Sequence, residues 1–132
     1  MEIRLYSQSD EAKLFELLCE EEWTDYCTDS AGYTKALLAS LTYVAYEDDV
    51  LCGYVRSRND DGFGVYVYDL LVKKAYRGRS FGRMLLEKVC AGHPQDTVYV
   101  MSDVDGYYEK QGYQRVGSVF EVSIPDEKGA LS

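Results

Sequence analysis

Three consecutive segments with the two-residue period of β-strands occupy the middle of the chain. They cover residues 41–46, 50–56 and 63–72, and the turns between them are built from aspartate, asparagine and glycine. Residues of these types reverse an extended chain within a few positions. The three segments therefore predict an antiparallel meander, which must bury at least one face against other elements.

Helical periodicity flanks this meander on both sides. A short strand over residues 1–6 leads to Ser9, which we expect to cap a helix over residues 10–21, and a second short helix is expected over residues 34–40. After the meander the pattern predicts a helix over 80–90, a strand over 97–101, a helix over 104–111, a final strand or hairpin over 113–124 and a polar tail over 125–132.

This order, β-α-α-β-β-β-α-β-α-β, combines a meander with one strand-helix-strand crossover. It predicts an α+β fold whose mixed, mostly antiparallel sheet is flanked by helices. The chain has 132 residues and no linker rich in proline, glycine or serine. We therefore expect a single domain spanning residues 1–132.

Charge and hydrophobicity exclude some classes of partner. The chain has 14 basic and 23 acidic residues and a formal charge of -9, which disfavours nucleic acid and anionic membrane surfaces. No apolar run approaches the roughly 18 residues of a spanning helix. The first residues lack the basic start and apolar stretch of a signal peptide, so we expect a cytoplasmic protein.

The four cysteines are widely spaced. Cys19, Cys27, Cys52 and Cys90 form no C-x-x-C pair, and His93 is the only histidine that could join them on a metal. The sequence therefore predicts reduced thiols and no metal site. The alternative is one or two disulfides, which suits small secreted domains without a sufficient core.

The stretch over residues 70–83 leads from the last meander strand into a helix N-terminus. Such a terminus presents backbone N–H groups without partners and favours a phosphate by up to about 2 kcal/mol. Glycines let the backbone approach the phosphate, and arginines add positive charge to an otherwise acidic chain. An ordinary turn with solvated arginines is the alternative. The residues concerned are Arg77, Gly78, Arg79, Ser80, Phe81, Gly82 and Arg83.

Two motifs in this part of the chain carry a family resemblance. Arg77, Ser80 and Gly82 resemble the R/Q-x-x-G-x-G/A signature of the GCN5-related N-acetyltransferase (GNAT) family, after an L-x-V-x-x-x-Y-R-G pattern. Residues 107–113 are similar to the family's F-Y-x-K-x-G-F segment. Ser80 departs from the signature, which has glycine there. We expect this position to avoid a conformation that only glycine tolerates well.

The resemblance implies a binding mode for acetyl-coenzyme A (acetyl-CoA) as acetyl donor. Its pantetheine arm lies in a V-shaped gap between two splayed strands and adds to the backbone of the first strand. The amide near Leu71 or Val72 then polarises the thioester carbonyl. Dimers are common in the family. The residues expected to bind this arm are Leu70, Leu71 and Val72, and Lys110 is a candidate contact to the ribose phosphate.

Transfer of an acetyl group to a primary amine needs an acid and a base. The resemblance assigns the acid to Tyr108, which protonates the leaving thiolate, although a packed aromatic residue is the alternative. The base stays open among Asp69, Glu22, Asp25 and a water chain. Strand alternation predicts that Asp69 faces the same side as Val67 and Leu71.

The acceptor site is expected in the aromatic and acidic connection after the first helix. Glu22, Trp23, Asp25 and Tyr26, with Tyr33 beyond them, suit an organic cation, although the aromatic residues could equally belong to the core. The acceptor is a small-molecule or peptide amine of unidentified kind. A non-catalytic acyl-CoA-binding regulatory module is the runner-up function. A P-loop nucleotide site is disfavoured because its lysine pattern is missing.

Overall fold

The computed structural model describes residues 1–102 and 104–125. They fall into two compact units, Met1–Met101 and a second unit that begins at Ser102. The expected tail beyond residue 125 lies outside the described residues. Within the described ranges, no helix is both long enough and apolar enough to cross a bilayer.

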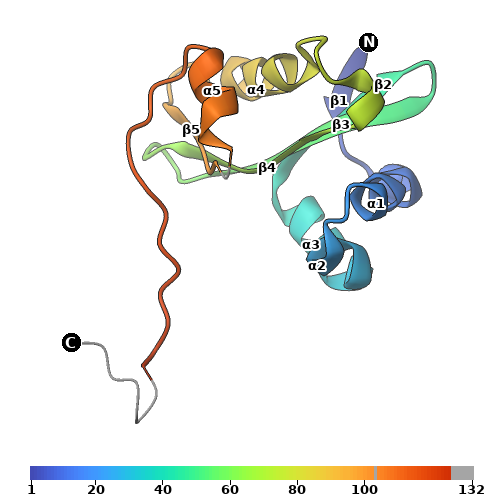
Figure 1. Ribbon diagram of the computed structural model, residues 1–132, viewed down its shortest axis with the longest axis horizontal. Coiled ribbons are helices and arrows are strands. Elements are labelled where there is room, and N and C mark those ends of the chain that lie inside the picture. Colours follow the sequence, from blue (N-terminus) through green and yellow to red (C-terminus); the bar gives the residue numbers. More distant parts are fainter. Residues whose placement is uncertain (103, 126–132) are drawn as a thin grey trace. The chain divides into compact units, whose positions relative to one another are not determined.

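A five-stranded sheet forms the centre of the first unit (Figure 1). The strands lie in the order of the sequence, and all neighbours are antiparallel except the last pair, which is parallel. The predicted meander and the mixed, mostly antiparallel sheet are therefore confirmed. The strands are β1 (Glu2–Leu5), β2 (Leu41–Glu47), β3 (Val50–Asn59), β4 (Val65–Val72) and β5 (Val98–Val100).

Helices cover both faces of this sheet (Figure 1). One face carries α1 (Glu11–Glu20), α2 (Thr24–Thr28) and α3 (Ser30–Ala39), and the other carries α4 (Phe81–Gly92). We call them the α1–α3 face and the α4 face. The short helix α2 was not predicted, because its five residues are too few to show a helical period. Two 3-10 turns, η1 (Gln8–Asp10) and η2 (Lys74–Tyr76), precede α1 and α4.

The main core lies between the sheet and the α1–α3 face. The apolar stripe of α1 packs there with residues of α3, β2, β3 and β4, as its three- and four-residue spacing requires. Tyr54 is fully buried in this cluster although it carries a hydroxyl, and that hydroxyl bonds to the one of Tyr33. The cluster comprises Leu14, Leu17, Leu18, Tyr33, Leu37, Val44, Leu51, Tyr54 and Leu71.

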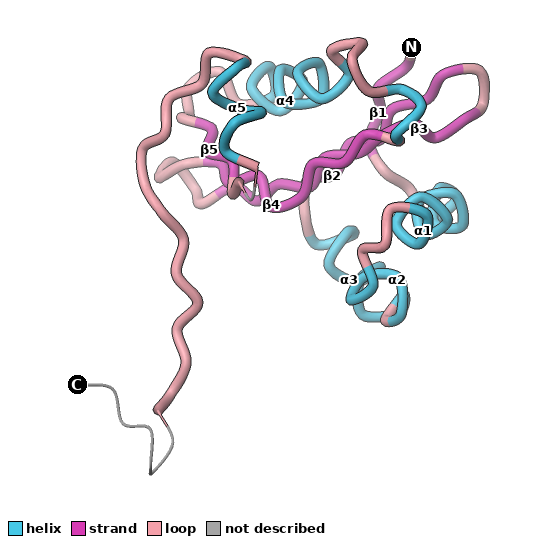
Figure 2. The backbone as a smooth tube through the Cα atoms, viewed as in Figure 1, coloured by secondary structure: helices cyan, strands magenta, loops and turns pink. Residues whose placement is uncertain are grey.

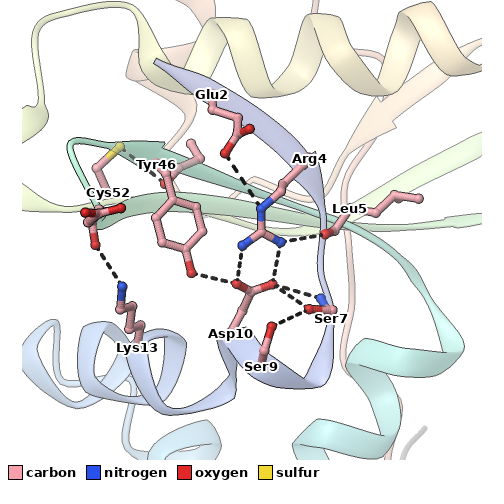
Figure 3. A network of polar contacts seen from close by, with 11 residues as sticks. Glu2, Arg4, Leu5, Ser7, Ser9, Asp10, Lys13, Tyr46 and Cys52 are labelled. Carbon is pink, nitrogen blue, oxygen red and sulfur yellow. Dashed lines mark hydrogen bonds and ion pairs between the residues drawn. The ribbon is translucent and has the colours of Figure 1, made fainter.

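A polar network around Asp10 fixes the start of α1 (Figure 3). Arg4 of β1 donates two hydrogen bonds to the Asp10 carboxylate, at 2.7 and 3.0 Å, and the Tyr46 hydroxyl of β2 donates a third at 2.6 Å. Burial opposes ionisation of Asp10, but the bonds from Arg4 and Tyr46 prevail and lower its pKa. The backbone amide of Ser7 also donates to Asp10. The expectation of Ser9 as cap is therefore wrong: the helical turn begins after Ser7, where Asp10 can close it.

A disulfide joins α1 to α2. It links Cys19 to Cys27, whose Cα atoms lie 5.3 Å apart. The prediction of reduced thiols is wrong for this pair, because a folded connection brought together two cysteines that are eight positions apart in the sequence. Cys52 and Cys90 are free.

Removing this disulfide should destabilise the protein. Replacing Cys27 with serine is expected to lower the free energy of unfolding by about 2–3 kcal/mol, because the unfolded chain regains the entropy of a closed eight-residue loop. Urea denaturation without reductant measures this difference. Cys90→Ser, at an exposed free cysteine, is the matched control and should unfold like the parent. An unchanged midpoint for Cys27→Ser would mean that the two thiols are not bonded in solution.

The second unit contains one helix, α5 (Asp105–Lys110), in its described part, and it ends near Gly112 as predicted. The final strand or hairpin predicted over residues 113–124 is not formed: the described residues after α5 are loop (Figure 2). Their apolar side chains are exposed, as at Phe120 and Ile124. The alternating pattern indicates that this segment favours an extended backbone. A β-strand also needs a neighbouring strand with which to form hydrogen bonds.

Candidate functional site

A β-bulge interrupts the pairing of β4 with β3. Arg56 pairs with Asp69, but the next residue, Ser57, pairs with Val67, so Tyr68 is an extra residue in β4. Because Arg56 and Ser57 point to opposite faces of β3, their partners do so too. Asp69 therefore faces away from Val67, so that part of the expectation is wrong, whereas Leu71 shares the face of Asp69 as expected. Uniform alternation cannot anticipate an inserted residue.

The bulge also marks the point where β4 and β5 separate. The two strands pair from Val65 to Val67, and the amide of Met101 donates to the carbonyl of Val67. The backbone amide of Lys73 donates a hydrogen bond to the carbonyl of Cys52 in β3. By alternation, the backbone groups of Leu70 and Val72 turn to the side of β4 away from β3, and those of Leu71 turn toward β3. The amide of Leu71 or Val72 was expected to donate to the oxyanion. Of these two, the Val72 amide lies on this open side.

Asp69 is the centre of a buried polar cluster on the α1–α3 face. Its side chain is 4% exposed and forms an ion pair with Arg56, whose Nε lies 2.5 Å from Oδ2. The hydroxyls of Tyr33 and Tyr26 also donate to it, the latter at 3.1 Å. Burial and the Asp69 charge raise the pKa of both tyrosines. Both phenols therefore stay protonated donors at neutral pH.

Of the five residues expected at the acceptor site, the structure brings two, Tyr26 and Tyr33, to Asp69. Tyr26 reaches it from α2 and stacks on Tyr33, with ring centroids 4.2 Å apart. Trp23 is half-buried and contacts the rings of Tyr26 and Tyr54, so it supports the cluster. Glu22 and Asp25 are exposed. The aromatic residues are thus both packed and close to the charged centre.

The loop between β4 and α4 has the form expected of an anion site. Helix α4 begins at Phe81, and the side chain of its N-cap residue, Ser80, makes no hydrogen bond to its first amides. Gly78 has φ +84°, and a Cβ added there would meet no atom within 4 Å, so the backbone is open to a ligand. Gly82 lies in the first turn of α4 and is buried. These amides can receive an anion along the helix axis.

Ser80 adopts the left-handed conformation, with φ 63° and ψ 19°. The expectation that serine would avoid this region is wrong. The surrounding turn holds this residue in a conformation that glycine adopts without steric cost, and the serine adopts it with steric strain. Its hydroxyl makes no cap hydrogen bond to α4.

The three arginines of this loop are engaged differently. Arg77 donates to the carbonyl of Val72 at 2.9 Å and pairs with Glu21, so it ties the loop to β4 and to the end of α1. Arg79 lies over the ring of Tyr76. The Nε atom of Arg83 lies 3.5 Å from Oε1 of Glu87, which is one turn further along α4. Arg79 and Arg83 are therefore less committed than Arg77 to contacts within the protein.

Comparison with known protein families shows to which family the chain belongs. The sequence profile of the acetyltransferase (GNAT) domain matches residues 39–115, more than half of the chain. The chain belongs to the GNAT family. No curated protein sequence matched it significantly.

Solved GNAT structures share the fold at low sequence identity. The aminoglycoside 6′-N-acetyltransferase AAC(6′)-IG of Acinetobacter haemolyticus has a TM-score of 0.76 and 18% identity, covering 93% of this chain and 97% of its own. A GNAT-family acetyltransferase of Streptococcus pneumoniae has a TM-score of 0.68 and 21% identity, with coverages of 92% and 97%. The aminoglycoside N-acetyltransferase AAC(6′)-Iy, solved with CoA, has a TM-score of 0.75 and 15% identity, with coverages of 92% and 93%.

The other two residues that the GNAT motifs select lie on α5. Tyr108 and Lys110 belong to its last turns, and the ring of Tyr108 contacts those of Tyr107 and Tyr113. The backbone amide of Tyr113 donates to the carbonyl of Tyr108 across the helix end. Their expected roles, the acid and the ribose-phosphate contact, stay predictions.

Sequence reasoning missed the arginine that holds Asp69. Arg56 is 12% exposed and lies between the rings of Tyr33 and Tyr68, 5.6 and 5.4 Å from their centroids. Its position two residues after Tyr54 places both on one face of β3. An arginine in the interior of an apolar strand was the available signal, because such a charge needs a buried partner.

Relieving the strain at residue 80 should stabilise the GNAT fold of this chain. Ser80→Gly is expected to raise the free energy of unfolding by up to about 1 kcal/mol, since glycine adopts positive φ without steric cost and no cap bond is lost. Chemical denaturation measures the change. Ser30→Gly, at the first residue of α3, is the control and should be neutral or destabilising. Destabilisation by Ser80→Gly would show that the serine is not strained.

Proposed function

We propose that this protein transfers an acetyl group from acetyl-CoA directly to the amine of a small molecule or peptide. The observation that carries the proposal is the juxtaposition, within one unit, of an open β4 edge and an uncapped α4 N-terminus. A pantetheine arm needs the first and a pyrophosphate needs the second. The CoA bound to the fold relative AAC(6′)-Iy supports the same choice of donor.

The loop residues fit the anionic part of this donor. The amides of Phe81, Gly82 and Arg83 are the first of α4 and supply backbone donors. Arg79 and Arg83 add positive charge, while Arg77 holds the loop on Val72. Lys110 on α5 is the candidate for the ribose phosphate. Leu70 offers its backbone groups and Val72 its amide to the arm, and Leu71 packs its side chain in the core.

The reaction needs one bond made and one broken. The amine nitrogen attacks the thioester carbonyl carbon, the C–S bond breaks, and the thiolate leaves. The Val72 amide stabilises the negative charge on the carbonyl oxygen. Tyr108 donates a proton to the thiolate, and the amine loses one to a base.

For the base we propose Asp69 acting through Tyr26. The Asp69 carboxylate is engaged by Arg56, Tyr33 and Tyr26 and is 4% exposed, so an amine cannot reach it directly. The Tyr26 hydroxyl can accept a proton from the amine while it passes its own to Asp69. Glu22 and Asp25 are exposed and lack contacts to this cluster among the described residues, so they are weaker candidates.

Cofactor binding should depend on the first turn of α4. Gly82→Val is expected to weaken acetyl-CoA binding at least tenfold, because a branched side chain there keeps a pyrophosphate from the helix amides. Arg79→Ala should change affinity only a few-fold, since salt screens an exposed charge. Calorimetric titration measures both. Circular dichroism must show that Gly82→Val is folded, and unchanged affinity in a folded variant contradicts the assignment.

The hydroxyl of Tyr108 should matter for turnover and not for binding. Tyr108→Phe is expected to lower kcat roughly 10²-fold or more, the lower range of general acid catalysis, with the acetyl-CoA Kd unchanged. Release of free thiol measures turnover on a panel of amines. Tyr113→Phe, another tyrosine of the same unit, is the control. Binding without turnover on any amine would favour a non-catalytic acyl-CoA-binding module.

A further inference from the structure

A cavity of about 410 Å³ opens beside the separation of β4 and β5. It lies at the ends of three strands, since Arg58 and Asn59 end β3, Tyr66 and Tyr68 belong to β4, and Met101 follows β5. Its lining residues are Arg58, Asn59, Asp60, Tyr66, Tyr68 and Met101. None of them was expected from the motifs, which direct attention to the α1–α2 connection.

This cavity adjoins the Asp69 cluster. Arg58 is two residues after Arg56 on β3, so both side chains lie on the α1–α3 face. The guanidinium of Arg56 pairs with Asp69 and also lies 5.4 Å from the ring centroid of Tyr68, which lines the cavity. The bulge places Tyr68 directly beside Asp69. A molecule in the cavity is therefore next to the proposed base and to the gap between the strands.

The described residues in the walls of the cavity combine flat rings with one charge of each sign. Tyr66 stacks on Tyr99 of β5, with ring centroids 5.2 Å apart, so its ring is held in place. Within the described part of the chain, Arg58 makes no ion pair, whereas Arg56, two residues before it, forms an ion pair with Asp69. Among the described lining residues, Asp60 supplies the one carboxylate. The described lining is therefore balanced in charge, although the whole chain carries -9.

We propose that this cavity holds the acceptor, and that the acceptor is a compact amine that also carries a carboxylate and a flat apolar group, as an aromatic amino acid does. The proposal rests on the acetyltransferase function above. A guanidinium pairs with a carboxylate through two parallel hydrogen bonds, and tyrosine rings pack against a flat group. The volume is near the lower end of the roughly 300–1,000 Å³ typical of ligand pockets. A polycation would find one acid, Asp60, among the described residues that line the cavity.

A matched pair of acceptors tests the carboxylate. Phenylalanine and phenethylamine share the ring and the primary amine, and only phenylalanine has the carboxylate. With acetyl-CoA as donor and free thiol as readout, we expect kcat/KM for phenylalanine to exceed that for phenethylamine at least tenfold. Arg58→Gln should remove this preference by lowering the phenylalanine value at least tenfold, with phenethylamine turnover unchanged. Arg115→Gln, at an exposed arginine of the second unit, should preserve it.

The outcomes separate this inference from the function on which it rests. Turnover of spermidine or an aminoglycoside with no preference for phenylalanine keeps the acetyltransferase function and overturns the acceptor class. A preference for phenylalanine that survives in Arg58→Gln overturns the role of this cavity. Absence of turnover with every amine overturns both. Because Arg58 is exposed, its replacement is not expected to disturb folding, and circular dichroism checks this.

Discussion

One extra residue in β4 determines the geometry of the whole site. Because Tyr68 is inserted, the alternation of backbone groups along β4 shifts by one residue at the bulge. The residues whose N–H and C=O groups point toward β3, and those whose groups point toward the β5 side, therefore differ between the two halves of β4. The half before the bulge pairs with β5, and the half after it turns Leu70 and Val72 to an open edge. The bulge thus determines which backbone groups of β4, the Val72 amide among them, turn to that edge without breaking the sheet.

The same insertion explains why a carboxylate lies within the core. Asp69 follows the bulge and faces α2 and α3, where burial without partners would be costly. Arg56, Tyr26 and Tyr33 supply those partners from three different elements. Because the cluster needs all of them in place, it fixes how the helices lie against the sheet. The Cys19–Cys27 disulfide acts on the same region, since Tyr26 precedes Cys27.

The sequence predicted features that depend on local pattern. The meander, the crossover helix α4 and the loop leading into it follow from periodicity and turn chemistry. It could not predict the bulge, because an inserted residue leaves alternation intact on each side. Nor could it predict the left-handed Ser80 or the Cys19–Cys27 pair, which depend on how the surrounding chain closes. The buried Arg56 was missed because a single charge in a strand does not reveal its partner.

The charge of the chain does not decide what it binds. A net charge of -9 acts through a field that salt screens within about 8 Å, and this field alone would favour cations and repel acetyl-CoA. At contact distance the signs differ from place to place: the α4 amides and arginines are positive, and the cavity lining is balanced. A zwitterionic acceptor has no net charge, so the overall field neither attracts nor repels it. Its selection would then rest on Arg58 and the tyrosine rings, which act only where the ligand touches them.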